Sequence, residues 1–177
     1  MAADPCLPHA DIRIVPMTLG DIPDALLLQA QSYPEALREK AAVFAARLAF
    51  RPCYCLTARR GGEMVGYLIA HPWERANPPA IGSLADPGRQ ADILYIHDLT
   101  IAAGARGLGM GERVLARAFV SARADGLSEA ELIAVEGAHT FWHRLGFREG
   151  HSPTIAAKTG QYGAQARWMR LETLSAR

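Results

Sequence analysis

A buried strand, a glycine-rich loop and an amphipathic helix follow one another between residues 93 and 126, and this order constrains the fold more than any other feature. The run ILYIHDLTI (93–101) is almost entirely apolar or β-branched, which predicts a strand buried on both faces. The loop ARGLGMG (105–111) has glycine at every second position from residue 107, and 111–126 puts its apolar residues on one helical stripe. Backbone N–H groups at a helix start bind anions, so the segment predicts a phosphate-binding loop.

The glycine spacing excludes two common nucleotide loops. A P-loop needs a lysine directly after its last glycine, and a dinucleotide fingerprint needs the spacing GxGxxG. Gly107, Gly109 and Gly111 are evenly spaced by two, and no lysine follows them. The loop must therefore fit another phosphate ligand, or it is a tight turn that uses glycine for packing alone.

Strand and helix patterns alternate along the rest of the chain, which predicts an α/β protein with a mixed sheet. We expect strands at 11–18, 53–60, 63–73, 93–101, 129–135 and 166–172, helices at 18–33, 34–50, 111–126 and 138–147, and loops at 74–92 and 148–163. No linker divides the sequence, so we expect one domain over 1–177, with 1–10 as a flexible N-terminal extension. The proline-rich segment 74–92 is a long loop, and loops of this length are often functional.

Composition limits which binding partners and which cellular compartment we expect. The formal net charge is +1 and the basic residues are scattered, which predicts neither a nucleic-acid nor a membrane partner. No apolar run reaches the ~20 residues that span a bilayer, and the start lacks the features of a signal peptide. The spacing of Cys6, Cys53 and Cys55 fits neither a zinc site nor a redox pair, so we expect reduced thiols, no metal and a cytoplasmic protein.

Two motifs together resemble the GNAT superfamily of N-acetyltransferases. Arg106-x-x-Gly109-x-Gly111 is similar to the superfamily's coenzyme A pyrophosphate loop, and FWHRLGF (141–147) to its aromatic helix end. The resemblance covers roughly residues 12 to 172. It implies acetyl-CoA as co-substrate and a mixed, mostly antiparallel sheet of about seven strands, splayed in the middle and flanked by about four helices. The cofactor contacts it implies are Leu99, Thr100, Ile101, Arg106, Gly107, Leu108, Gly109, Met110, Gly111, Glu112 and Trp142.

Acyl transfer to an amine also requires a base. An alkyl amine with a pKa near 10.4 is neutral in only about one molecule per thousand at pH 7.5, a deficit of roughly 4 kcal/mol. Tyr95 and His97 are two apart and so share one face of the predicted strand, whereas Asp98 is expected on the other. His97 has the side chain best suited to accept a proton near neutrality. A core histidine that bonds a backbone carbonyl is the alternative.

Within the superfamily, GEMVGYLIAHPW (62–73) and IHDLTI (96–101) look like the arylalkylamine (serotonin) N-acetyltransferase branch. That branch carries two histidines, two apart; His97 matches the second, and Tyr95, a phenol that could relay a proton, stands at the first. Trp142 stands where the family usually has a tyrosine that protonates the leaving thiolate, and an indole cannot act as that acid. His139, His143 and Tyr162 are the remaining candidate acids.

The sequence therefore predicts an acetyl-CoA-dependent N-acetyltransferase that transfers an acetyl group to the primary amine of a small molecule by direct attack in a ternary complex. Tyr95 and His97 are the expected catalytic residues, and a monomer or homodimer is expected. A non-catalytic acyl-CoA-binding regulatory module is one alternative. An enzyme that acetylates a protein N-terminus or lysine is another.

Overall fold

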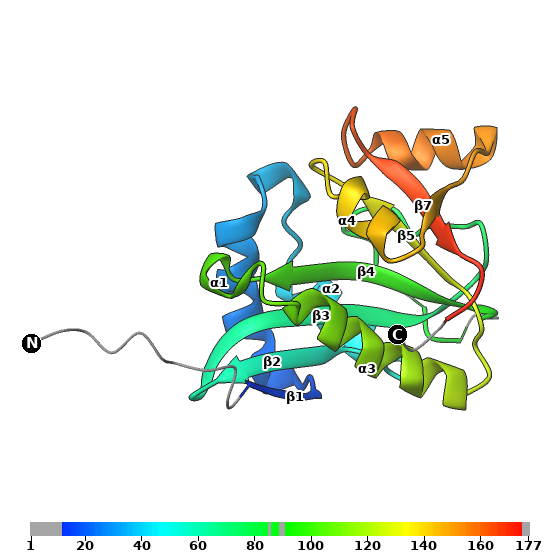
Figure 1. The fold of residues 1–177 in the computed structure, drawn as a ribbon. Helices are drawn as coiled ribbons and strands as arrows, with labels where there is room; N and C mark the ends of the chain where they lie inside the picture. Colours follow the sequence, from blue (N-terminus) through cyan, green and yellow to red (C-terminus); the bar gives the residue numbers. More distant parts are fainter. Residues whose placement is uncertain (1–11, 85, 89–90, 175–177) are drawn as a thin grey trace, which may run out of the picture.

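A seven-stranded sheet in the order β1-β2-β3-β4-β5-β7-β6 forms the centre of the protein (Figure 1). The computed structural model describes residues 12–84, 86–88 and 91–174, so the expected extension over 1–10 lies outside the described residues. The strands are β1 (Ile12–Pro16), β2 (Leu56–Arg60), β3 (Glu63–Trp73), β4 (Ile93–Ile101), β5 (Ala130–Ala134), β6 (Arg148–Glu149) and β7 (Arg167–Leu171). Among the strand pairs in this described part of the chain, only β4–β5 is parallel. The sheet is therefore mixed and mostly antiparallel, as expected.

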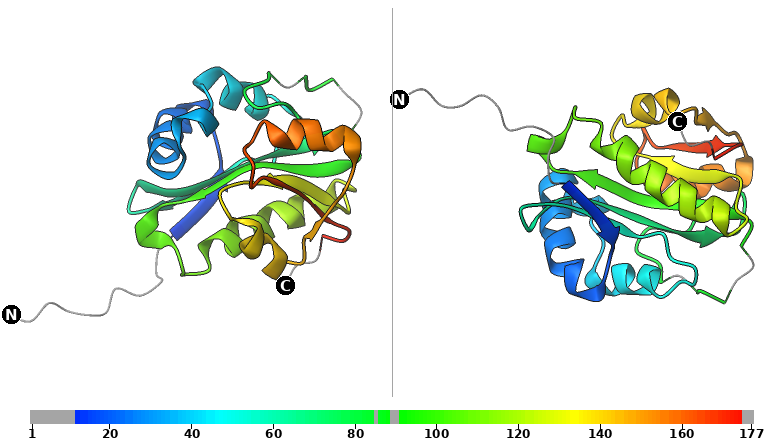
Figure 2. Two further views of the ribbon diagram at one scale, coloured as in Figure 1. Left: turned by 90° about the horizontal axis from the view of Figure 1, so that it is seen from above. Right: turned by 60° about the horizontal axis from the view of Figure 1, so that its bottom comes forward.

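Helices cover both faces of this sheet. Figure 2 shows α1 (Ile22–Ser32) and α2 (Ala41–Leu48) on one side and α3 (Met110–Ala124) on the other. The core beneath α3 and α4 (His139–Arg144) is built around Leu68, Leu94 and Leu115, and the core beneath α1 and α2 around Phe44 and Tyr67. Each core buries one face of the sheet, and this burial is the main source of stability.

Strands β4 and β5 pair over only part of their length. Leu94, Tyr95 and Ile96 pair with residues 130–132, and β4 then continues to Ile101 without a partner on that side among the described residues. The sheet is thus splayed in the middle. The free edge of residues 97–101 leaves backbone groups available to a ligand, because unpaired N–H and C=O groups need other partners.

A β-bulge in β4 overturns one expectation. Ile69 of β3 lies opposite Asp98 and Ala70 lies opposite Ile96, so His97 is an extra residue between the two pairs. A bulge places two residues of one strand against one of its partner and interrupts the alternation of side chains. Asp98 consequently faces α1 and α2, on the same side as His97, and the prediction that it points the other way was wrong.

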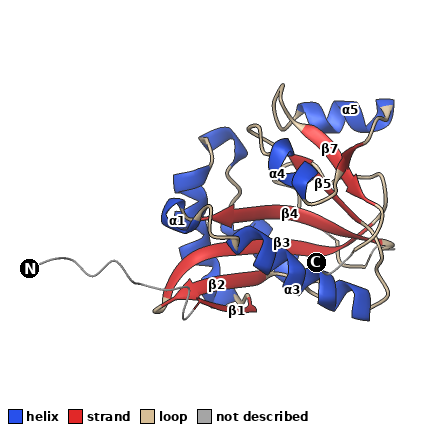
Figure 3. Cartoon of the chain, in the orientation of Figure 1, coloured by secondary structure: helices blue, strands red, loops and turns tan. Residues whose placement is uncertain are grey.

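Two helix predictions also need correction. The expected helix over 34–50 is only a 3-10 turn, Glu35–Leu37, followed by α2, because Arg38 is extended (φ −82°, ψ 132°). The expected loop over 148–163 contains the helix α5 (Pro153–Gly160; Figure 3). This helix has proline in its first turn and buries Ile155. The described residues therefore form five α-helices rather than four.

Candidate functional site

The glycine loop leads directly into α3. Gly107 and Gly109 have φ angles of +75° and +68°, in the left-handed region that favours glycine. A Cβ at Gly109 would meet no atom within 4 Å, so the space in front of the loop is open. The first helical hydrogen bond of α3 runs from the N–H of Arg113 to the Gly109 carbonyl, 3.1 Å, which leaves the N–H groups of residues 110–112 outside the helix ladder.

An outer groove of about 520 Å³ lies in front of this loop. Its walls come from the free end of β4, the glycine loop and the first turn of α3, with Phe141 and Arg144 of α4 opposite. Nine residues of the expected cofactor set line it: Leu99, Thr100, Ile101, Arg106, Gly107, Gly109, Met110, Gly111 and Glu112. Leu108 does not line the groove, and its side chain is exposed. Arg106 is held by a hydrogen bond from its Nε atom to the Ile101 carbonyl, 2.9 Å.

These features fit a coenzyme A pyrophosphate and its pantetheine arm. Free N–H groups at the start of a 15-residue helix supply the donors and the positive end of the helix dipole that an anion needs. The unpaired edge of β4 continues from the loop and offers hydrogen bonds to an extended, amide-containing chain. The cofactor roles of the individual residues remain predictions.

An inner cavity of about 160 Å³ adjoins the groove. The two spaces share Tyr33, Leu99 and Phe141, so they meet at the point where β4 leaves β5. The inner cavity is lined by Gln29, Leu37, Glu39, Ile81, Ile96, His97, Asp98, Leu132, Ile133, Val135, Ala138, Trp142 and Tyr162 in addition to the shared residues. Two of these are carboxylates, and the lining contains no lysine or arginine from the described part of the chain.

His97 forms a buried pair with Glu39 from the segment that joins α1 to α2. The His97 Nε2 and Glu39 Oε2 atoms are 2.6 Å apart, and the two side chains are 5% and 7% exposed. Burial acts to raise the pKa of Glu39, but the charge of His97 and hydrogen bonds from His97 and the Gly82 N–H outweigh it, and the pKa lies below its ordinary value. Because a carboxylate can only accept, the Nε2 atom of His97 carries the hydrogen that faces Glu39.

Asp98 is the second carboxylate of the cavity. It accepts hydrogen bonds from the Tyr33 hydroxyl, 2.8 Å, the Tyr67 hydroxyl, 2.5 Å, and the Thr100 hydroxyl, 3.1 Å. Burial raises the pKa of Asp98 above its ordinary value, although the bonds from Tyr67 and Tyr33 act in the opposite direction. Asp98 therefore connects three hydroxyl groups at the junction between the cavity and the groove.

Tyr95 does not line either space. Its ring packs in a buried hydrophobic cluster with Phe50, Trp73 and Ile93, and the ring centroid is 6.2 Å from that of His97. Complete burial raises the pKa of Tyr95 well above its ordinary value, so the phenol stays protonated. Tyr95 is adjacent to the candidate base, as its spacing predicts, but it is not placed to touch a substrate.

Trp142 lines the inner cavity instead of the outer groove. Its ring packs edge-on against Phe141 and Phe147, at centroid distances of 5.0 and 5.3 Å. The hydroxyl of Tyr162, another candidate acid, donates to the Pro79 carbonyl, 2.9 Å, and so fixes the position of Pro79. Of the other two candidates, His143 contacts the Phe147 carbonyl, and neither it nor His139 lines the cavity.

We predict that Trp142→Phe keeps kcat/KM within about tenfold, because the smaller ring can retain the contacts with Phe141 and Phe147 and no proton chemistry is lost. Trp142→Tyr should not lose activity. Steady-state kinetics with acetyl-CoA and a good acceptor checks both variants. A hundredfold fall in kcat with unchanged cofactor affinity would show that the indole takes part in the chemistry.

Sequence reasoning missed Glu39 and His71. Glu39 lies between two helices, in a segment with no motif, and its contact with His97 spans 58 positions in the chain. His71 of β3 is opposite Tyr95 in the sheet register and its ring centroid is 6.1 Å from that of His97. The strand pairing of 63–73 with 93–101 was the one available signal for His71.

Comparisons with known proteins identify a family for the chain and proteins of similar fold. The model of the acetyltransferase (GNAT) family matches residues 23–147, and no curated protein matches the chain in sequence. The fold is similar to Ard1 from Thermoplasma volcanium, with 15% identity, a TM-score of 0.71 and coverage of 93% of this chain and 99% of that one. It is also similar to ribosomal-protein-S18-alanine N-acetyltransferase from Escherichia coli, with 15% identity, a TM-score of 0.66 and coverage of 94% of this chain and 97% of that one.

The PaiA N-acetyltransferase from Thermoplasma acidophilum, solved with coenzyme A, is a third similar structure, with 11% identity, a TM-score of 0.65 and coverage of 92% of this chain and 99% of that one. Over residues 12–84, 86–88 and 91–174, no helix has the length and apolar character needed to cross a membrane. The chain belongs to the acetyltransferase (GNAT) family of enzymes, and its acetyl donor is acetyl-CoA.

Proposed function

We propose that this enzyme transfers the acetyl group of acetyl-CoA to the primary amine of a small molecule, by direct attack in a ternary complex. One observation carries the proposal: the inner cavity that holds the Glu39–His97 pair shares Tyr33, Leu99 and Phe141 with the groove that fits coenzyme A. An amine in the cavity would therefore lie beside the end of the pantetheine arm. Such positioning is a large part of catalysis by acyl transferases.

Charge and shape of the cavity favour a cationic, mostly apolar acceptor. Glu39 and Asp98 attract an ammonium group, and the described lining has no lysine or arginine to pair with a carboxylate. Apolar side chains such as Leu37, Ile81 and Trp142 supply the remaining wall. An arylalkylamine, the class implied by the resemblance of the sequence, fits this description.

The 74–92 loop supports a small acceptor rather than a protein. Ile81 lines the cavity, the Gly82 N–H donates to Glu39 Oε1, 2.8 Å, and the Ser83 carbonyl accepts from Arg47 Nη2, 3.1 Å. Together with the bond from Tyr162 to Pro79, these contacts hold residues 79–83 at one side of the cavity. A protein N-terminus needs an open approach, so this alternative is disfavoured, although proteins of similar fold carry that activity in their names.

The chemistry follows from the geometry. Acetyl-CoA, when bound, supplies the acetyl group as a thioester. The Glu39–His97 pair would take the proton that the amine nitrogen sheds as it bonds to the acetyl carbon, and the carbon–sulfur bond then breaks. A coenzyme A thiol with a pKa near 8.5 leaves as a thiolate at a cost of only about 1.4 kcal/mol at pH 7.5, so water can protonate it.

The test is a direct assay of thiol release. Purified protein is incubated with acetyl-CoA and a panel of arylalkylamines, alkylamines, amino acids and short peptides, and free thiol is measured against a sample without acceptor. We expect turnover with amines that lack a carboxylate. Peptide turnover alone would transfer the proposal to a protein acceptor, and cofactor binding without any turnover would favour the regulatory module.

The free thiols of Cys53 and Cys55 support the cytoplasm as the compartment of this reaction.

A further inference from the structure

The volume of the inner cavity limits what an acceptor can carry beside its amine. This volume is about 160 Å³. An apolar cavity of about 150 Å³ in a protein core holds one benzene molecule. Under the proposed function the acetyl group enters from the groove and takes part of the space, so the acceptor has at most the room of one ring and a short chain. An indole, which fuses a second ring to the first, exceeds this room.

The wall formed by Ile81 is fixed on both sides of that residue in the chain. The Pro79 carbonyl accepts from the Tyr162 hydroxyl, 2.9 Å, and the Gly82 N–H donates to Glu39 Oε1, 2.8 Å. Tyr162 and Glu39 line the same cavity as Ile81. Moving the backbone of Ile81 away from the cavity would break one of these bonds, so this wall resists widening.

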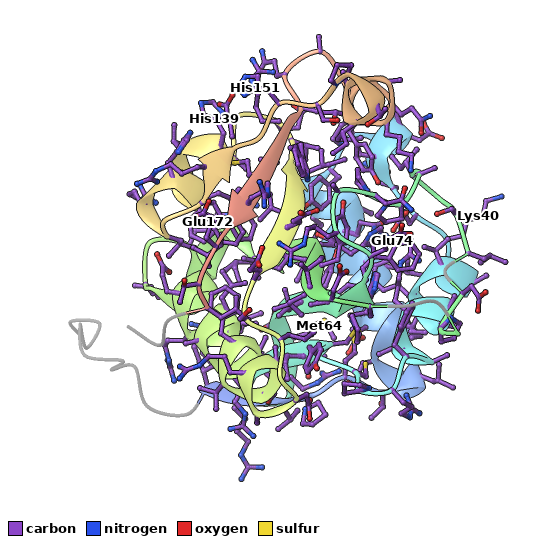
Figure 4. The ribbon with its side chains drawn as sticks, turned by 90° about the vertical axis from the view of Figure 1, so that its right-hand side faces the viewer. Lys40, Met64, Glu74, His139, His151 and Glu172 are labelled. Atoms are coloured by element: carbon purple, nitrogen blue, oxygen red, sulfur yellow. The ribbon has the colours of Figure 1, made fainter. Side chains whose placement is uncertain are left out.

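The same contacts place Ile81 at the end of the cavity that attracts the amine. Gly82, the next residue in the chain, bonds to the carboxylate that is paired with His97. Lys40 follows Glu39 but is exposed and extends outward at the margin of the molecule in Figure 4, so it brings no competing positive charge into the cavity. An ammonium group at Glu39 would therefore lie close to Ile81, and the rest of the acceptor must fit beside that side chain.

We propose that Ile81 sets an upper size limit, so that this enzyme takes primary amines with one aromatic ring or a short alkyl chain and rejects indole amines. The inference rests on the proposed function and narrows its acceptor class. Apolar area alone predicts the reverse order, because the larger indole would bury more surface and bind more tightly in an open site. The order of the two classes therefore distinguishes a size-limited cavity from an open one.

The first test measures binding and needs no turnover. Phenethylamine and tryptamine carry the same aminoethyl chain and differ in the ring alone. Each is titrated into the protein with saturating coenzyme A, which fills the groove and has no acetyl group to transfer. We expect phenethylamine to bind at least about tenfold more tightly than tryptamine. A smaller preference, or no binding of phenethylamine, would overturn the size limit.

The second test enlarges the cavity. Ile81→Ala removes apolar volume from the wall and leaves the backbone bonds of Pro79 and Gly82 in place, so the preference for phenethylamine should fall at least about fivefold. Ile81→Val should shift it in the same direction by less, and serves if the alanine variant does not fold. Leu84→Ala is the matched control, since Leu84 lies in the same segment, is 69% exposed and does not line the cavity. An unchanged preference in a folded Ile81 variant, or an equal change in Leu84→Ala, would overturn the role of Ile81.

Turnover separates this inference from the proposed function. With acetyl-CoA in place of coenzyme A, thiol release should follow the order of binding, with phenethylamine above tryptamine. Tighter binding of phenethylamine without thiol release from any amine would contradict the proposed function and support the size limit. Thiol release from both amines at equal kcat/KM would support the transfer reaction and overturn the size limit.

Discussion

Gly109→Asp should weaken the binding of acetyl-CoA by at least about 100-fold, roughly 2.7 kcal/mol. A Cβ at residue 109 points into open space, so an aspartate side chain would extend into the region in front of the α3 N-terminus. Its carboxylate would occupy the place of the pyrophosphate and repel it. Isothermal titration of acetyl-CoA measures the loss, and thermal unfolding confirms that the variant is folded.

Gly109→Asn is the matched control for this prediction. Asparagine has the same shape as aspartate, caps a helix N-terminus about as well, and bears the same cost of about 1 kcal/mol for the left-handed backbone at φ +68°. The difference between the two variants therefore isolates the charge. Gly111 is less suitable, because a Cβ there would lie 3.1 Å from the Phe141 ring. Equal affinities in the Asp and Asn variants would sink the assignment of the loop to pyrophosphate.

His97→Ala should lower kcat/KM by about 10²–10⁴ with little change in acetyl-CoA affinity, because the amine would lose the group that accepts its proton. Activity of the wild-type enzyme should fall as the pH falls, since a pair that already holds the proton cannot accept another. In the variant this acidic limb should flatten or move. Rates measured between about pH 6 and 9 provide the test.

His97→Gln separates base catalysis from packing. Its amide can still donate to Glu39 and fills more of the space than alanine, but it cannot take up a proton. His139→Ala serves as a control on a histidine outside both spaces. If His97→Gln retains full activity and the wild-type pH profile, His97 is a structural histidine of the core.

The local patterns were sufficient for the scaffold. The mostly apolar run over 93–101 and the helical stripe after the glycines identified β4 and α3 nearly to the residue, because burial imposes a strong pattern on both. The helix α5 was missed since its single buried residue, Ile155, gives almost no periodic signal. The extended backbone at Arg38 could likewise not be predicted, because the sequence of 34–50 has a helical pattern over its whole length.

The inner cavity was less predictable, since its chemistry depends on contacts between distant segments. His97 could be proposed from its own strand, but its partner Glu39 comes from a loop without a motif. Asp98 was assigned to the wrong face because alternation assumes regular pairing, and the bulge depends on how β3 fits against β4. Side-chain partners of this kind need the tertiary structure.

The bulge also bears on how such a site can be gained or lost in evolution. Ile96 and Asp98 already lie opposite consecutive residues of β3, so a strand without His97 could keep regular pairing. All the remaining side chains of β4 would then stay on their present faces of the sheet. Deletion of one codon would thus remove the proposed base and leave the rest of the strand in place. Insertion of one codon into a regular ancestor would add it, without any change to the hydrophobic pattern that directs folding.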